Sequence, residues 1–148
     1  MSKPLPEITE LLPHRGSAIL VDKILAETAG GVITTVHIDR SHIFYSIEQS
    51  GVPSWVGIEF MAQTIGLHAG LSALRTNEPP RIGYLLGTRR YVPVVPCFPD
   101  GANLKISVDQ LYWDVSGLGA YDCTIVSEGC LWAHSKIIVF QAGKETVE

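Results

Sequence analysis

The chain is poor in residues that could hold a small domain together by covalent or metal bonds. Its 148 residues include three cysteines, too few and too scattered for a disulfide framework or a zinc site. No basic tract is present, and the formal net charge of -4 argues against nucleic acid as the main partner. The residues therefore imply neither a metal nor an organic cofactor.

The chain also begins without the long apolar core of a signal peptide, which makes a cytoplasmic location the default expectation. Its one long apolar stretch, between Ser54 and Leu74, contains an acid, an amide and an imidazole. Such groups are costly in a bilayer, so we expect no membrane span. We expect a single domain over residues 1–148, with an ordered core over about 8–141 and a tail over 142–148.

The stretch over residues 51–75 predicts the element around which the rest of the chain is organised. It begins with Pro53 and the capping-type residue Ser54, and it ends with Arg75, a cation where the helix dipole favours one. Its body is rich in helix-forming residues and is apolar on nearly every side. A helix of this kind must be buried on nearly every side. We therefore predict a long central helix wrapped by a sheet.

The remaining segments predict one helical turn, at residues 8–12, and a set of strands. The segment 81–95 contains Gly87 and Pro93, which favour an edge strand or a bulge. This order predicts an α+β fold in which an antiparallel sheet surrounds one helix. A single such layer leaves strand edges and an apolar face, so we expect pairing with a second copy. The strands are predicted at 17–25, 32–38, 81–95, 102–115, 118–128 and 130–141, with a turn at 96–101.

Glu59 is the most informative residue of the predicted helix. A carboxylate in the second turn of an apolar helix is rarely buried without a reason. Gln63 lies one turn further along the same face, so the two side chains form a polar notch. The alternative is an exposed Glu59 that only interacts favourably with the helix dipole. Spacing alone leaves both interpretations open.

Four motifs carry a resemblance to a known family. Their order resembles that of the hotdog-fold β-hydroxyacyl-acyl-carrier-protein dehydratases from Ile8 to Gln141. More narrowly, GVPSWVGIEFMAQTIG and GYLLGTRRYVP are similar to the divergent dehydratases encoded with aryl polyene lipid pathways. The resemblance implies a hotdog fold, a dimer and a 3-hydroxyacyl substrate carried by acyl carrier protein. The motifs are LLPHR at 11–15, VDKIL at 21–25, GIEFMAQTIG at 57–66 and YVPVVP at 91–96.

The resemblance also implies roles for particular residues. In this family an imidazole removes the α-proton of the substrate, and a helix carboxylic acid helps the hydroxyl to leave as water. Glu59 occupies the position of that acid. Backbone N–H groups near Val56 and Gly57 would polarise the thioester carbonyl. The family's histidine position is held here by Tyr45, and a deletion in the loop would bring His42 into its place.

Three functions follow as alternatives. The chain is expected to be a dehydratase, with Tyr45 and Gln63 as further substrate-binding candidates. The second alternative is a non-catalytic or half-site subunit of a hetero-oligomer, in which a related hotdog chain supplies the missing histidine and this chain supplies Glu59. The third is a hotdog thioesterase, in which Glu59 would activate water. Detection of a free acid product separates the thioesterase from the dehydratase.

Overall fold

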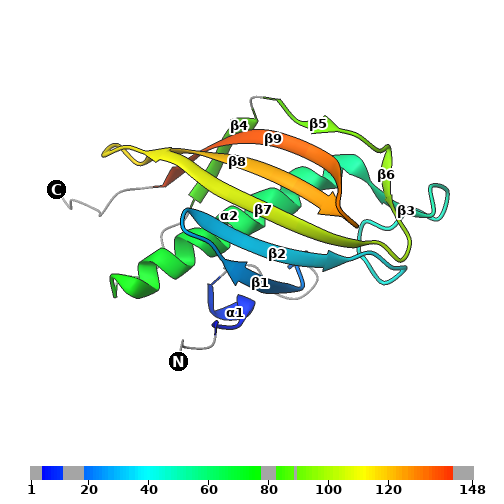
Figure 1. Ribbon diagram of the computed structural model, residues 1–148, viewed down its shortest axis with the longest axis horizontal. Helices are drawn as coiled ribbons and strands as arrows, with labels where there is room; N and C mark the ends of the chain where they lie inside the picture. Colours follow the sequence, from blue (N-terminus) through cyan, green and yellow to red (C-terminus); the bar gives the residue numbers. More distant parts are fainter. Residues whose placement is uncertain (1–4, 12–18, 78–82, 89, 142–148) are drawn as a thin grey trace.

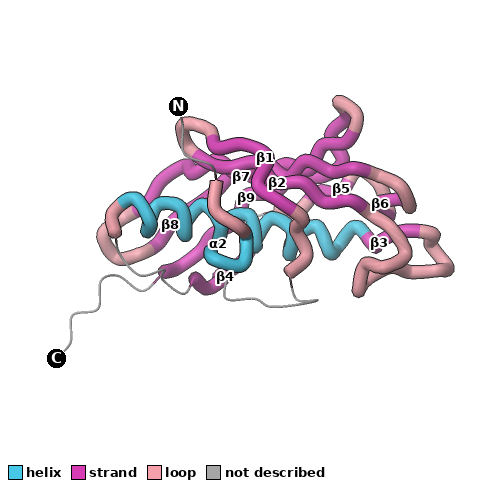
Figure 2. The backbone as a smooth tube through the Cα atoms, turned by 90° about the horizontal axis from the view of Figure 1, so that it is seen from below, coloured by secondary structure: helices cyan, strands magenta, loops and turns pink. Residues whose placement is uncertain are grey.

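The computed structural model describes residues 5–11, 19–77, 83–88 and 90–141. Within these ranges one long helix lies against the inner side of a curled antiparallel sheet (Figure 1). Seen from below, the helix runs along one side of the sheet (Figure 2). The helices are α1 (Ile8–Leu11) and α2 (Gly57–Arg75), and a short 3-10 helix (Ser54–Val56) leads into α2. The strands are β1 (Lys23–Glu27), β2 (Gly31–His37), β3 (Gly51–Pro53), β4 (Gly83–Thr88), β5 (Val92–Pro93), β6 (Cys97–Pro99), β7 (Asn103–Trp113), β8 (Leu118–Ser127) and β9 (Cys130–Gln141).

The main sheet has the strand order β1-β2-β7-β8-β9-β4, and β5 also pairs with β9. Every pair in it is antiparallel. The strands β3 and β6 form a separate two-stranded sheet at the start of α2. Because β7, β8 and β9 are the longest strands, the sheet is continuous over the length of the helix.

Alternation along the strands sets which side of the sheet faces α2. On β7 the side chains of Leu104, Ile106 and Val108 are buried while their neighbours are exposed or partly exposed. The same alternation on β8 buries Tyr121 and Ile125. These inward side chains and the apolar residues of α2 form one hydrophobic core.

The central helix is covered by the sheet on one side only. Phe60, Met61 and Leu67 are fully buried in the core. Thr64 lies on the same side, and its hydroxyl is 2.8 Å from that of Thr34 on β2, which joins helix and sheet by a buried polar contact. No helix in the described ranges is long and apolar enough to cross a membrane.

A stripe of apolar and small residues runs along the other side of α2. Its members recur at helical spacing and are only partly buried within this chain. The predicted burial on nearly every side is therefore not completed by a single chain. The helix stripe consists of Ile58, Ala62, Gly66, Ala69 and Ala73.

The structure confirms the predicted helix and most strands, and it corrects several details. Ser54 makes no side-chain capping hydrogen bond, because the chain enters α2 through a 3-10 helix that follows Pro53. The first strand begins at Lys23. The segment 81–95 is divided between β4 and β5, with the expected irregularity between Leu85 and Gly87. The tail 142–148 lies outside the described residues.

The predicted turn at 96–101 is confirmed only at Asp100 and Gly101. The residues before them form β6, which pairs with β3. Each of these strands has three residues, too few for alternation to show in the sequence.

Two adjacent glycines test how closely the strands approach. A Cβ on Gly31 would overlap the backbone carbonyl of Val108 on β7, whereas a Cβ on Gly30 would meet no atom within 4 Å. We expect Gly31→Ala to lower the free energy of unfolding by about 1–3 kcal/mol, because the backbone must shift. Gly30→Ala should change it by less than about 0.5 kcal/mol. Urea denaturation measures both, and equal losses would contradict the close approach.

Candidate active site

Glu59 lies in the first turn of α2 and is partly buried. Its Oε2 accepts a hydrogen bond from Nε2 of Gln63 at 3.2 Å. Gln63 is only 2% exposed, and its Oε1 accepts the backbone N–H of Leu20 at 2.9 Å. The Gln63 amide therefore links the carboxylate to the segment that precedes β1. The polar notch predicted from the spacing is confirmed, and a fixed amide holds one oxygen of Glu59 in place.

His42 lies in the loop between β2 and β3 and is half-buried. Its ring contacts Phe60, the chain neighbour of Glu59, in an edge arrangement with centroids 5.7 Å apart. Its Nδ1 accepts the backbone N–H of Phe44 at 3.1 Å. Its Nε2 is buried and has no hydrogen-bond partner. Neither ring nitrogen therefore bonds to Glu59 within this chain.

A pocket of about 300 Å³ opens beside His42. The segment before β1, the end of β2 and the following loop form its walls. Two aspartates, two histidines and a serine give it a mainly polar lining with apolar residues at its margin. The lining residues are Ile19, Leu20, Asp22, His37, Asp39, Ser41, His42 and Ile43.

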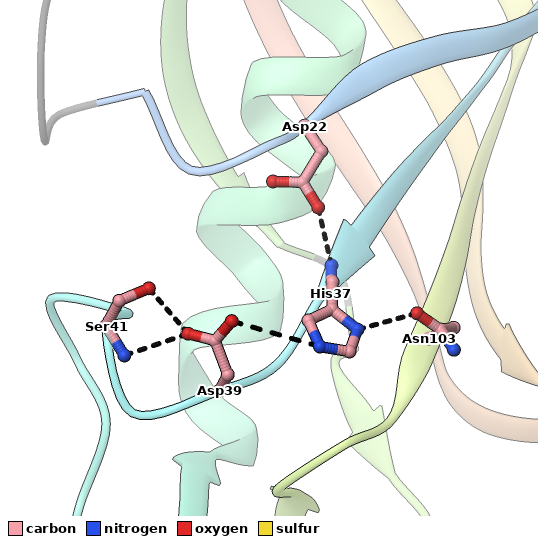
Figure 3. Close-up of polar contacts among 5 residues, drawn as sticks. All are labelled: Asp22, His37, Asp39, Ser41 and Asn103. Atoms are coloured by element: carbon pink, nitrogen blue, oxygen red, sulfur yellow. Dashed lines mark hydrogen bonds and ion pairs between the residues drawn. The ribbon is translucent and has the colours of Figure 1, made fainter.

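A hydrogen-bond network fixes this wall around His37 (Figure 3). Asp22 accepts the backbone N–H of His37 at 2.6 Å, and Asn103 Oδ1 lies 2.7 Å from Nδ1 of His37. Asp39 accepts bonds from the backbone N–H and hydroxyl of Ser41, at 2.8 and 2.5 Å. These bonds hold the pKa of Asp39 below its usual value, so it stays charged at neutral pH. The network anchors the start of the loop that carries His42.

The backbone N–H groups of Val56 and Gly57, at the start of α2, were expected to be available to a substrate carbonyl. Val56 and Gly57 are both buried, but the Gly57 N–H already donates to the Ser54 carbonyl. The Tyr91 hydroxyl donates to the same carbonyl. Of the two expected donors, the N–H of Gly57 is thus already used within the chain. Tyr45 is partly buried against the core and does not line the pocket.

Tyr91 is a residue that the sequence interpretation missed. Its hydroxyl passes directly over Gly57, where a Cβ would overlap it. Burial raises the pKa of Tyr91 to about 12, so the hydroxyl remains a proton donor at all ordinary pH values. The only signal in the sequence was a glycine at the start of an otherwise well-formed helix. Gly57 is required there because it leaves room for Tyr91.

The other histidines have structural partners. Nδ1 of His68 lies 2.8 Å from the hydroxyl of the buried Tyr121, and Nε2 of His134 lies 2.8 Å from Asp122. No group of three or more His, Cys, Asp or Glu side chains able to hold a metal occurs in the part of the chain that the structure describes. His14 lies outside the described residues.

A family model described as ApeP-like, ApeP dehydratase, matches residues 6–147, nearly the whole chain. The chain belongs to the ApeP-like dehydratase family. It is also 30% identical over 141 residues to the 3-hydroxyacyl-[acyl-carrier-protein] dehydratase FabZ of Bartonella quintana (strain Toulouse), covering 90% of this chain and 86% of that protein. The FabZ of Rhizobium etli (strain CIAT 652) is 29% identical over 143 residues, covering 92% and 87%.

The fold of this ApeP-like chain is similar to that of a solved dehydratase complex. The structure titled "The Dehydratase Heterocomplex ApeI:P from Xenorhabdus doucetiae" matches it with a TM-score of 0.85 and 26% identity, covering 94% of this chain and 93% of the other. The predicted hotdog fold and the resemblance to 3-hydroxyacyl-acyl-carrier-protein dehydratases are confirmed. The family favours dehydration over the thioesterase alternative.

The contact between Gly57 and Tyr91 can be tested by a double-mutant cycle. Gly57→Ala should lower the free energy of unfolding by about 1–3 kcal/mol through overlap with the Tyr91 hydroxyl. Tyr91→Phe should lower it by about 0.5–1.5 kcal/mol through loss of one hydrogen bond. The double variant should lose less than the sum, because phenylalanine removes the nearest overlapping atom. Purely additive losses in urea denaturation would contradict this contact.

The buried imidazole of His68 predicts how the free energy of unfolding depends on pH. Burial lowers its pKa from 6.5, although Asp109 acts in the opposite direction. The unfolded chain therefore binds more protons just below pH 6.5, and the stability contributed by neutral His68 is present above this pH and lost as the pH falls. His68→Gln should make the free energy of unfolding depend less on pH between about 5 and 7. An unchanged pH dependence would show that His68 does not contribute.

Proposed function

We propose that this chain is the glutamate-bearing subunit of a 3-hydroxyacyl-acyl-carrier-protein dehydratase. A base removes the α-proton, Glu59 donates a proton to the leaving 3-hydroxyl, and water and a 2-enoyl thioester are formed. The observation that carries the proposal is the position of Glu59, in the first turn of the central helix with one oxygen held by Gln63. The family relationship supplies the reaction class.

The base of this reaction comes, in our proposal, from a second chain. The resemblance places Tyr45, and not an imidazole, at the family's histidine position. Nδ1 of His42 is occupied by the Phe44 N–H, and Nε2 forms no hydrogen bond within the described part of the chain. We infer that a histidine-bearing hotdog chain supplies the base that completes the site.

The helix stripe supports association with such a chain. Ile58, Ala62, Gly66, Ala69 and Ala73 are only partly covered, and small side chains allow another element to approach α2 closely. Glu59 adjoins this stripe on the helix surface. A partner that covers the stripe would therefore bring its own side chains next to Glu59. The related dehydratase from Xenorhabdus doucetiae is described as a heterocomplex, which favours a different chain over a second copy.

Several finer features belong to the same proposal. The backbone N–H groups near Val56 and Gly57 are the candidates that would polarise the thioester carbonyl, and that of Gly57 also donates to the Ser54 carbonyl within the chain. The context that we propose is aryl polyene biosynthesis in the cytoplasm, and the pathway rests on the resemblance of the segments GVPSWVGIEFMAQTIG and GYLLGTRRYVP. The acyl chain would pass Tyr45 and Gln63 at the margin of the core.

The substitution Glu59→Gln tests the role of the acid. Glutamine keeps the size and can still accept the bond from Gln63, so the thermal midpoint should stay within a few degrees of wild type. It cannot donate an acidic proton, so dehydration should fall by at least about 100-fold. The measurement, made on a mixture of this chain with a histidine-bearing hotdog chain, is loss of water from a 3-hydroxyacyl carrier-protein thioester, detected by mass spectrometry. Glu48→Gln, in the exposed part of the loop, is the matched control and should retain activity.

The same assay, run with and without a histidine-bearing hotdog chain, tests the division of the site. We expect no turnover by this chain alone and turnover by the mixture. Full activity of the Glu59→Gln mixture would reject Glu59 as the acid. Full activity of the isolated wild-type chain would reject the shared site while leaving Glu59 in place. Release of a free acid instead of water would identify a thioesterase.

A further inference from the structure

The protonation pattern of His42 follows from one backbone hydrogen bond. The N–H of Phe44 lies 3.1 Å from Nδ1 of His42. A backbone N–H can only donate, so Nδ1 must present its lone pair. A neutral imidazole carries a single ring proton, which in this arrangement is on Nε2. The loop geometry therefore selects the tautomer in which Nε2 is a hydrogen-bond donor.

The surroundings of the ring keep it neutral. Burial lowers the pKa of His42 from 6.5, and this effect exceeds the opposite influence of Asp22 and Asp39. His37 shares the pocket wall with His42, and Phe60 packs against the other side of the ring. At pH 7 and above the ring is accordingly uncharged, with its proton on Nε2.

The Nε2–H group has no acceptor of its own. Its nitrogen is buried, and no atom in the described part of the chain forms a hydrogen bond with it. Buried donors without a partner are rare in folded proteins, because the group loses its bonds to water and gains nothing in exchange. His42 also lines the 300 Å³ pocket, which is large enough for a short acyl group. Nε2 itself has almost no surface exposed to solvent, so a ligand oxygen reaches it only where the ligand displaces the atoms that cover it.

We propose that His42 donates its Nε2–H hydrogen bond to an oxygen of the acyl thioester substrate, and that it is not the base of the reaction. This inference rests on the proposed dehydratase function. A 3-hydroxyacyl thioester offers two suitable acceptors, its carbonyl oxygen and its hydroxyl oxygen. A donor to the carbonyl stabilises the negative charge that develops when the α-proton leaves, and a donor to the hydroxyl orients the leaving group. For His42 to act as a base at Nε2, the proton would have to move to Nδ1, where the Phe44 N–H prevents it.

Nitrogen-15 NMR of the imidazole rings in the isolated wild-type chain at pH 7.5 tests the tautomer without any activity. The His42 signals are those that are absent from the spectrum of the His42→Phe variant. We expect them to show a protonated Nε2 and an unprotonated Nδ1. A proton on Nδ1, or on both nitrogens, would overturn the inference. This result does not depend on whether the proposed function is correct.

Three substitutions then separate a donor from a base in the complex with the histidine-bearing chain. Glutamine carries its amide N–H near the position of Nε2, asparagine carries it near that of Nδ1, and phenylalanine has none. We expect His42→Gln to retain turnover within about 10-fold of wild type, while His42→Asn and His42→Phe lose about 100-fold or more. If His42 is the base, glutamine should lose as much as phenylalanine. Wild-type turnover in all three variants would show that His42 does not contact the substrate.

Binding of two pantetheine thioesters to the same variants identifies the acceptor oxygen. It can be measured even if the complex shows no dehydration. The probes are 3-hydroxybutanoyl-pantetheine and butanoyl-pantetheine, which lacks the hydroxyl. Weaker binding of both probes to His42→Phe, with recovery in His42→Gln, supports the carbonyl as acceptor. Weakening for the 3-hydroxy probe alone supports the hydroxyl. Equal affinity of wild type and His42→Phe for both probes overturns the inference, and circular dichroism confirms that each variant is folded.

Discussion

One sheet can cover only part of an apolar helix, and this constraint shapes the whole molecule. The inward faces of β2, β7, β8 and β9 bury the side of α2 that carries Phe60, Met61 and Leu67. The opposite side, which holds the helix stripe, is only partly buried by its own chain. The hydrophobic effect that folds the chain therefore also favours association with another one. The fold and the oligomeric state that we propose have the same physical origin.

Glu59 lies at the border between these two sides of the helix. On the inner side the Gln63 amide bridges its carboxylate to the Leu20 backbone, so the acid is held by a buried and satisfied polar contact. On the outer side it adjoins the stripe that a partner would cover. A carboxylate in this position is accessible to a substrate that enters between two chains. This placement explains how a polar group is retained in an otherwise apolar helix.

The loop between β2 and β3 carries His42, which we propose to act as a hydrogen-bond donor and not as the base of the reaction. The network around His37 anchors the start of this loop, and the Phe44 N–H sets the orientation and tautomer of His42. In our proposals His42 is a hydrogen-bond donor and Glu59 is the acid, and a second subunit supplies the base of the dehydration.

Much of the fold could be predicted because periodicity is a local property. The long apolar run 54–74 indicated the central helix, alternation indicated β2, and segments joined by glycine-containing turns indicated β7, β8 and β9. The short pair β3 and β6 was missed because three residues cannot show a period. The assignment of Ser54 as a helix cap was wrong because a 3-10 helix, clamped by Tyr91, precedes α2. That contact joins residues 37 positions apart, and no local pattern encodes it.

The features of the candidate site also divide into those that the sequence shows and those that only the folded chain shows. The sequence by itself determined that Glu59 and Gln63 share a helix face, because residues four apart in a helix are always neighbours. The resemblance of its motifs also implied that Tyr45 stands at the family's histidine position, with His42 as the alternative. Only the tertiary structure decided that Gln63 reaches Leu20, that Tyr91 lies over Gly57, and that Nε2 of His42 is buried without a hydrogen-bond partner in the described part of the chain. These outcomes depend on the packing of segments distant in sequence, since orientation, burial and protonation are properties of the folded surroundings.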